Sequence, residues 1–344
     1  LDEPLTPTNF NIKEASTQGS GPVDPAKIDQ RAAFVDRTGI KVYELAFDLQ
    51  SYEYGSTDMT AFVPELGVPG IVRMAVQRKP DTRIHGIRSD GTAMVAIFEK
   101  AEEVLCWQEV ETDGEIEDVV VLPGAPGSTE DQVHYVVART INGSTVRYLE
   151  KWAKETECRG GTLNKQADAF VTFTNSPASA TVSGLTHLIA KTVVAWYDGK
   201  CAQTAGAIAT FTVSAAGTIT LSEAASTGIV GIAYNARWRS SKLGLQLSLA
   251  DMPLTKHKRV DELGLVLAYA HAKGLRYGPD FDNLDDLPEI EEGTTVSADA
   301  IRTSYDEEPV MFPGIWKTDA RLCLRADAPR PVTVLAAIPS LEIS

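Results

Sequence analysis

The chain has 344 residues, of which 47 are acidic and 32 basic, so its formal net charge is −15. This length gives room for two or three domains of about 100–200 residues each. The acid excess excludes a protein that grips nucleic-acid phosphates through clustered lysines and arginines. No run of about 18 apolar residues occurs, so the sequence predicts no membrane span.

The first 33 residues are predicted to be an extended N-terminal segment, and a repeat dominates the chain after them. Three hairpin-like stretches centre on glycines that follow one another at intervals of 52 residues: Gly39, Gly91 and Gly143. Tight hairpin turns need a positive φ, which glycine adopts at little cost. Asp90-Gly91 and Asn142-Gly143 fit the rule for two-residue turns, and Thr38-Gly39 fits it less well. The three glycines are therefore predicted to be structural turn formers.

An arginine stands shortly before each glycine, at Arg37, Arg88 and Arg139, and is predicted to be structural. Further turns between the hairpins divide each unit of about 52 residues into about four short strands, which is the content of a β-propeller blade. A plain β-meander with coincidental spacing is the alternative. Residues 34–167 are thus predicted to be propeller blades. Because propellers have about 4–8 blades and the chain starts at Leu1 rather than Met, we expect upstream blades or an incomplete ring.

The remaining chain divides into two further β regions. Residues 168–240 are rich in Ala, Thr, Ser, Val and Gly and nearly uncharged, with strands separated by turns such as Asp198-Gly199. They predict a small β-barrel or sandwich inserted into the chain. Residues 241–344 are predicted to be a C-terminal β region that completes the platform. In it, the stretch from Lys256 to Gly278 has both helical and alternating spacing, and Gly264 and Gly274 favour a strand. The predicted fold class is all-β.

Seven acids crowd a short stretch between Pro279 and Glu292, and these are Asp280, Asp282, Asp285, Asp286, Glu289, Glu291 and Glu292. Such a cluster can bind calcium or supply a carboxylate pair for glycoside hydrolysis. The calcium-loop template fails here, because its sixth position counted from Asp280 is Asp285 rather than the glycine that the sharp turn of the loop needs. Prolines bracket the stretch. It is therefore interpreted as an acidic loop that is solvated, lines a channel or contacts a neighbouring subunit.

No motif of catalysis, cofactor binding or metal binding is recognisable, so the sequence predicts no catalytic, cofactor-binding or metal residue and a protein that is not an enzyme. The four cysteines form no CxxC pair. The five histidines have no metal-ligand spacing, and His85 and His134 are interpreted as structural. No nucleophile elbow or phosphate-binding loop occurs. Trp107 and Trp152 are predicted to pack between blades.

Four stretches, "KPDTRIHGIRSDG", "CWQEVETDGEIEDVVVLPG", "DQVHYVVARTINGSTVRYLEK" and "RVDELGLVLAYAHAKGLRYGPDFDNLDDLP", resemble a family of bacteriophage virion structural proteins. The resemblance extends from about residue 34 to residue 338. Members of this family carry a small insert likened to the FCCH domain of ubiquitin-activating enzymes, and residues 168–240 match its place. The resemblance further suggests the tail nozzle of short-tailed phages.

The resemblance implies an architectural function without catalytic residues. A nozzle of this kind is a homohexameric ring that extends the portal channel, retains the packaged genome and lets it pass during ejection. Its partners would be other copies of itself, the portal or adaptor and other tail proteins, with DNA as a transient, non-specific passenger. Such a protein is made in the host bacterial cytoplasm and ends in the virion tail. An acidic lumen would repel phosphates and let DNA slide.

A different function is open as an alternative. A tail protein that binds or degrades carbohydrate on the host surface would also be acidic and β-rich. It predicts paired carboxylates in a cleft lined by aromatic side chains. Aromatic residues make up only 7% of the chain and are scattered among core-like positions, so the channel component is the preferred hypothesis.

Overall fold

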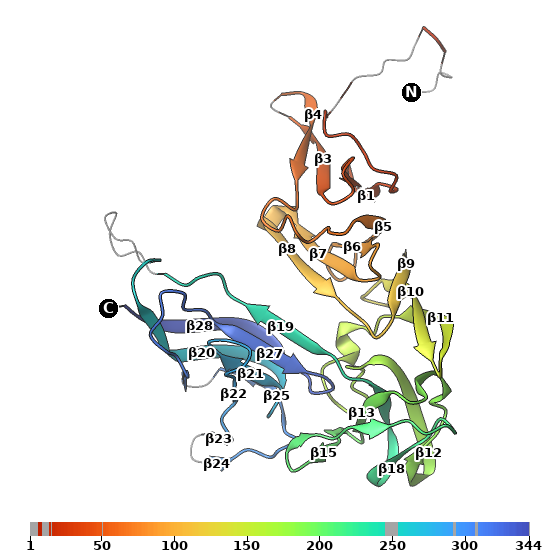
Figure 1. Ribbon diagram of the computed structural model, residues 1–344, viewed down its shortest axis with the longest axis vertical. Coiled ribbons are helices and arrows are strands. Elements are labelled where there is room, and N and C mark those ends of the chain that lie inside the picture. The colour runs from red at the N-terminus through yellow and green to blue at the C-terminus, as the bar shows by residue number, and fades with distance from the viewer. Residues whose placement is uncertain are drawn as a thin grey trace. The chain divides into compact units, whose positions relative to one another are not determined.

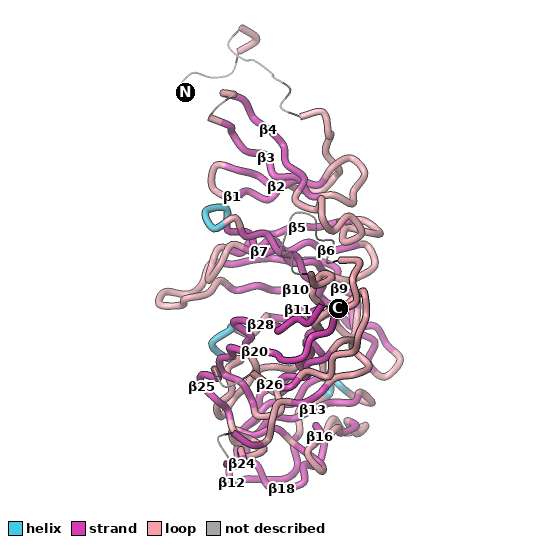
Figure 2. Tube along the Cα trace, turned by 90° about the vertical axis from the view of Figure 1, so that its left-hand side faces the viewer, coloured by secondary structure: helices cyan, strands magenta, loops and turns pink. Residues whose placement is uncertain are grey.

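The computed structural model describes residues 6–8, 14, 16–49, 51–244, 254–291, 294–306 and 309–343. Within these ranges strands dominate, and the only helices are three 3-10 turns (Figure 2): η1 (Lys100–Glu102), η2 (Glu155–Glu157) and η3 (Thr186–Leu188). No helix in the described ranges has the length and hydropathy needed to cross a membrane. The predicted all-β class is confirmed.

The chain forms two compact units, Leu1–Trp152 and Ala153–Ser344. Each unit has hydrophobic clusters of its own, two in the first unit and three in the second. The division into four segments that the sequence suggested stays a prediction. The first sheet begins at Ala26, inside the segment expected to be extended, because a short strand precedes the first recognisable hairpin.

The first unit is a partial β-propeller made of three successive antiparallel sheets, in chain order in Figure 1, which we name blades 1 to 3. Blade 1 consists of β1 (Ala26–Ile28), β2 (Arg31–Val35), β3 (Val42–Asp48) and β4 (Glu53–Asp58). Blade 2 consists of β5 (Ile71–Gln77), β6 (Arg83–Arg88), β7 (Ala93–Glu99) and β8 (Val104–Val110). Blade 3 consists of β9 (Glu115–Leu122), β10 (Gln132–Ile141) and β11 (Ser144–Lys151).

Blade 3 departs from the expected four strands, since its described sheet contains three. After β11 the chain leaves the sheet at Trp152 and enters η2 instead of returning as a fourth strand.

The blades pack face to face through the alternation of their strands. In blade 2, Ile84 and Met94 lie in a cluster shared with blade 1, whereas Ile87 and Ala93 lie in a cluster shared with blade 3. Blade 2 is therefore buried on both faces, which explains the nearly continuous apolar sequence of β7.

Residues 168–232, the larger part of the predicted insert, fold around a cluster of buried side chains that includes Leu185, Val193 and Val230. Its five-stranded sheet is β12 (Asp168–Val182), β18 (Ile219–Ile232), β13 (Thr192–Tyr197) and β14 (Lys200–Cys201), with β17 (Phe211–Thr212) also paired to β13. A small two-stranded sheet joins β15 (Gln203–Thr204) to β16 (Ala207–Ile208).

The rest of the second unit holds two larger sheets and one ribbon. One sheet orders β19 (Asn235–Arg239), β27 (Cys323–Asp327), β21 (Leu275–Gly278) and β22 (Asp285–Asp286). The other centres on β20 (Lys258–His271), paired with β25 (Ile301–Tyr305), β26 (Val310–Met311) and β28 (Thr333–Ile343). The ribbon pairs β23 (Ile290–Glu291) with β24 (Thr294–Thr295).

The stretch with ambiguous spacing is the strand β20, as favoured from the sequence. Leu263, Leu265 and Leu267 alternate along it and are all buried in one cluster. The two-residue period therefore governs the packing of this stretch, and the helical spacing is coincidental.

Candidate functional site

All three repeat glycines lie in the turn between the second and third strands of their blade. Their φ angles are nearly the same, +80° at Gly39, +81° at Gly91 and +80° at Gly143. Only the last turn has two residues, because Ile141 pairs directly with Ser144. In this turn both Asn142 and Gly143 have a positive φ, as two-residue hairpin turns of type I′ require.

The Asp90-Gly91 turn is wider than the sequence suggested. The N–H of Arg88 donates to the carbonyl of Thr92 at 2.9 Å, which leaves three residues in the turn. The Asp90 carboxylate stabilises this width by accepting hydrogen bonds from the backbone N–H of Thr92 at 3.1 Å and from its hydroxyl.

Two of the three repeat arginines are buried and tie their blade to the segment that leads into its first strand. The Arg88 guanidinium donates to the carbonyl of Leu66 at 3.0 Å and to the Glu109 carboxylate at 2.7 Å. Arg139 donates to the carbonyl of Asp113 at 2.7 Å and binds both carboxylate oxygens of Glu150, at 2.6 and 2.7 Å. These arginines act as structural braces at equivalent places in blades 2 and 3.

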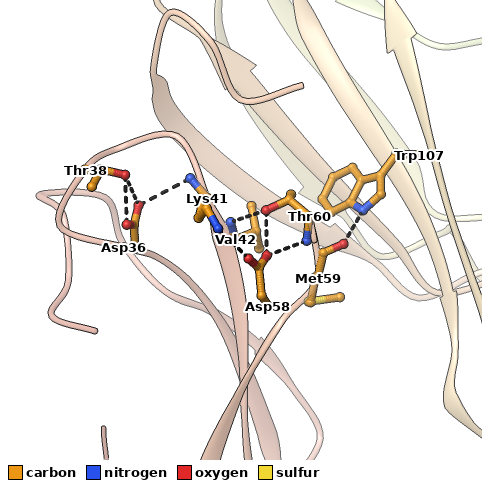
Figure 3. Close-up of polar contacts among 8 residues, drawn as sticks. All are labelled: Asp36, Thr38, Lys41, Val42, Asp58, Met59, Thr60 and Trp107. Atoms are coloured by element: carbon orange, nitrogen blue, oxygen red, sulfur yellow. Dashed lines mark hydrogen bonds and ion pairs between the residues drawn. The ribbon is translucent and has the colours of Figure 1, made fainter. Parts of the chain in front are cut away.

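Blade 1 departs from this pattern. Arg37 is exposed, and the buried residue at its turn is the neighbouring Asp36. Its carboxylate accepts hydrogen bonds from the Thr38 hydroxyl at 2.7 and 2.8 Å and from the backbone N–H of Lys41 at 3.3 Å (Figure 3). Asp36 therefore stabilises its own, longer turn and, among the described residues, makes no contact like those of Arg88 and Arg139 with a preceding segment.

A second acid, Asp58, binds Lys41 and extends this group of hydrogen-bonded side chains toward blade 2. The Lys41 ammonium donates to Asp58 at 2.8 Å, and this hydrogen bond raises the pKa of Lys41. Partial burial opposes ionisation of Asp58, but hydrogen bonds from Lys41 and Thr60 keep its pKa below the usual value. Next to it, the Trp107 indole N–H of blade 2 donates to the carbonyl of Met59 at 2.8 Å (Figure 3). The cluster links blades 1 and 2.

A buried histidine, His85, links blades 2 and 3 by hydrogen bonds. His85 Nδ1 lies 2.8 Å from the Tyr135 hydroxyl, and Nε2 lies 3.2 Å from Gln77 Oε1. Gln77 Oε1 can only accept, so Nε2 carries the proton and Nδ1 accepts from Tyr135. The Trp152 ring meets the His85 ring edge to face, with centroids 5.1 Å apart. Burial, aided by Arg83, lowers the pKa of His85 to about 4, so the ring is neutral.

Within the acidic loop, three of the seven acids are paired with cations of the same unit. Glu289 lies 2.8 Å from the Lys273 ammonium, and the hydrogen bond lowers the pKa of Glu289. Asp286 lies 3.3 Å from Arg276, and Asp280 lies 3.9 Å from Lys317. Asp280 also caps its own loop by accepting hydrogen bonds from Asn283, which lower its pKa.

Of the other four acids, the structure describes the side chains of two. Asp282 and Asp285 are exposed. Glu291 belongs to β23 by its backbone, and Glu292 lies outside the described residues. Among the residues that the structure describes, no group of three or more His, Cys, Asp or Glu side chains is arranged to hold a metal ion. The described part of the loop thus combines carboxylates in ion pairs, of which Asp286 and Glu289 are exposed as well, with two exposed carboxylates that make no ion pair among the described residues.

Sequence reasoning missed a buried polar cluster within the second unit. His271 accepts a hydrogen bond at Nδ1 from the backbone N–H of Lys273 at 3.0 Å, and its Nε2 lies 3.8 Å from Asp299. Burial, together with Arg330 and other nearby cations, lowers the pKa of His271 to about 4. Arg330 donates to the carbonyl of Gly206 at 2.7 Å, joining the insert to the C-terminal strands. The members are far apart in sequence, so no local pattern signals them.

A groove of about 330 Å³ also lies on the sheet centred on β20. Two acids, Glu262 and Asp306, line it together with apolar side chains that include Leu265 and Ile338. No local sequence pattern indicates this groove, because its walls come from β20, β28 and the segment around Pro309.

No family model and no curated protein matches the chain. Solved structures do match, among them an exo-beta-1,3-galactanase from Phanerochaete chrysosporium with beta-1,3-galactotriose. The two chains are 9% identical, the match covers 98% of each, and the TM-score is 0.25. A likeness at this level assigns neither a fold nor an activity to the chain.

This comparison nevertheless corrects one expectation. The sequence predicted a protein that is not an enzyme, and the matched galactanase is an enzyme. The earlier expectation rested on the lack of recognisable motifs, and motifs are a poor guide when the residues of a site come from distant parts of the chain. We therefore withdraw it.

Proposed function

We propose that the chain is a structural component of a bacteriophage tail, a nozzle ring that extends the portal channel for genome retention and DNA ejection. One observation carries this proposal. The stretches that resemble the virion family coincide with the parts that build the blades and the sheet around β20: the β6 turn, the β8-to-β9 connection, the β10–β11 hairpin and β20 itself. The likeness thus concerns the framework of the protein.

The buried polar groups are consistent with a framework role. Arg88, Arg139 and His85 connect blades or their connecting segments through hydrogen bonds of 2.6–3.2 Å. Buried polar groups that are fully paired make a structure rigid and specific. A ring under the pressure of a packaged genome requires rigidity of this kind. The net charge of −15 further supports a surface along which DNA moves without adhering.

Electron microscopy of the purified chain and of its virion tests the proposal. We expect a ring of six copies, coaxial with the tail, in contact with the portal or adaptor. A chain that is absent from the virion contradicts the proposal. A monomer that binds glycans supports the carbohydrate-directed alternative instead.

The acidic loop allows a second, finer test. The structure singles out Asp282 and Asp285, because both are exposed and neither forms an ion pair among the described residues, whereas Asp280, Asp286 and Glu289 pair with cations. If the loop lines the channel, the double substitution Asp282→Lys and Asp285→Lys slows genome ejection while particles still assemble. The substitutions Glu102→Lys and Glu103→Lys, at exposed acids in and after η1, change the net charge equally and serve as the control. Failure of assembly would assign the loop to a subunit contact.

A further inference from the structure

One sheet of the second unit carries a row of arginines across its strands. The register pairs Arg237 of β19 with Arg325 of β27, and Arg325 with Arg276 of β21. Side chains that stand directly opposite each other on neighbouring strands lie on the same face, with Cβ atoms about 4.5–5.5 Å apart. Leu275 and Tyr277, on either side of Arg276, pack into the core, so the arginines lie on the outer face of the sheet.

Two arginines of this row have carboxylate partners within the unit. The Arg325 guanidinium donates to Asp327 at 2.8 Å, and Arg276 lies 3.3 Å from Asp286. Like charges directly opposite each other destabilise a sheet, and these ion pairs offset the repulsion at two of the three positions. The third position, at the edge of the sheet, is different.

The arginines of the edge strand β19 are exposed and keep their charge. Arg237 lies over the Phe281 ring, 5.6 Å from its centroid. Arg239, two residues further along β19, lies on the same face of the strand and is also exposed. Neither arginine forms an ion pair with a residue that the structure describes. The edge therefore stays positive although the chain has 47 acidic residues and only 32 basic ones.

Further cations extend the positive charge beyond the end of β19. Arg321 donates to the carbonyl of Ser240 at 3.2 Å, which brings it beside the residue that follows Arg239. Asp319 lies among these cations. The hydrogen bond that it accepts from Arg321 at 2.8 Å lowers its pKa, and the charges of Lys242 and Arg239 lower it further. One carboxylate thus faces three cations, so the local potential is positive.

We name five cations of this surface the basic edge: Arg237, Arg239, Lys242, Arg321 and Arg325. Ion pairs among the described residues neutralise two of them, Arg321 by Asp319 and Arg325 by Asp327. Guanidinium groups are planar forks that bind two oxygens of one phosphate at once. A polymer with a phosphate in every unit therefore offers the negative charge that the basic edge lacks.

We propose that the basic edge binds the phosphate backbone of double-stranded DNA without preference for sequence. Each strand of DNA carries one charge about every 3.4 Å, so its phosphates can reach cations that stand about 5 Å apart on neighbouring strands. The choice of DNA among polyanions rests on the proposed function, which brings DNA to this protein, whereas the basic edge itself does not. The acid excess of the whole chain keeps this binding weak and dependent on salt, as the passage of DNA requires.

Binding of a fluorescently labelled DNA duplex to the full chain, followed by anisotropy over a range of salt concentrations, tests the site. The double substitution Arg237→Gln and Arg239→Gln should weaken binding roughly ten-fold or more. It should also reduce the slope of log K against log salt concentration by about 2, close to one for each lost phosphate contact. In the control, Arg73→Gln and Arg147→Gln remove the same charge from exposed arginines of blades 2 and 3 and should leave the affinity and the slope nearly unchanged.

Three results would overturn the inference. The wild type binds no DNA even at low salt, the two double variants lose affinity equally, or polyglutamate displaces the labelled duplex better than unlabelled DNA does. The last result would assign the basic edge to an acidic protein segment. A chain that forms the virion ring but binds no DNA refutes this inference and leaves the proposed function standing. A chain that binds DNA through the basic edge but is absent from the virion supports the inference and refutes the proposed function.

Discussion

At the scale of residues, buried charged side chains lie where the blades meet their connecting segments. Arg139 is the clearest case, since its residue is 1% exposed and its guanidinium is hydrogen-bonded to Glu150, Thr112 and the carbonyl of Asp113. A buried ion pair adds little net stability over an apolar pair, but removing one partner leaves the other charge uncompensated. Substituting such a residue therefore lowers the stability by more than the ion pair itself contributes.

Substituting Arg139→Met should lower the free energy of unfolding by about 3–5 kcal/mol, because Glu150 and the Asp113 carbonyl lose their donor. Urea unfolding followed by tryptophan fluorescence measures this change. The matched control is Arg147→Met on the adjacent strand, whose 65% exposed side chain pairs with Glu117 at the surface. We expect no measurable shift of the midpoint for the control. Similar midpoints for the two variants would contradict the role of Arg139 as a brace.

At the scale of elements, the β-hairpin turns determine how each blade meets the next. The three turns share a glycine in the left-handed region although their lengths differ. Only Gly91 is also closely packed, because a Cβ atom there would lie 2.8 Å from Cβ and 2.9 Å from Cα of Glu115 at the start of blade 3. Conformation alone thus requires glycine at Gly143, whereas both conformation and close packing require it at Gly91.

Gly143→Ala should therefore cost about 1–2 kcal/mol of unfolding free energy, the penalty of a left-handed backbone for a residue with a side chain. Gly91→Ala should cost clearly more, because the added methyl group also pushes the backbone of β9 away. The urea midpoints of the two variants, measured under the same conditions, give the comparison. Equal losses would mean that the contact between the Gly91 turn and β9 adjusts without cost.

At the scale of the whole molecule, each of the two units contains a buried neutral histidine. His85 lies between blades 2 and 3, and His271 lies at the junction of the insert and the C-terminal strands. In both, burial lowers the pKa from 6.5 to about 4. An unfolded chain binds these protons at a higher pH than the folded chain does.

Stability should therefore be complete above about pH 6.5 and fall as the pH drops from 6.5 toward 4, by roughly 2–3 kcal/mol for each histidine. Urea midpoints between pH 7.5 and 4.5, followed by tryptophan fluorescence, measure this loss. His85→Gln should flatten the pH dependence of that signal, whatever its effect at neutral pH. His257→Gln, at an exposed position, should leave the slope unchanged. An unchanged slope in His85→Gln would exclude His85 as the source.

Local patterns allowed much of the fold to be predicted. The interval between the three glycines, the alternation around their turns, and Gly264 and Gly274 in and after β20 indicated an all-β chain with blade-like repeats. Such signals are local, because φ preferences and strand periodicity act over a few residues. The same local signals misjudged the width of the Asp90-Gly91 turn, since the hydrogen bonds between Asp90 and Thr92 set its length.

Only the tertiary structure decided which polar residues are buried and paired. Arg37, Arg88 and Arg139 look alike in sequence, yet Arg37 is exposed and Asp36 takes its place. The acidic loop looked like one cluster, but Lys273, Arg276 and Lys317 pair with three of its members. Burial and partners depend on contacts between residues far apart in the chain. By itself, the sequence determined the all-β class and the repeating unit, whereas long-range packing decided which polar residues are buried and that the described sheet of blade 3 has three strands.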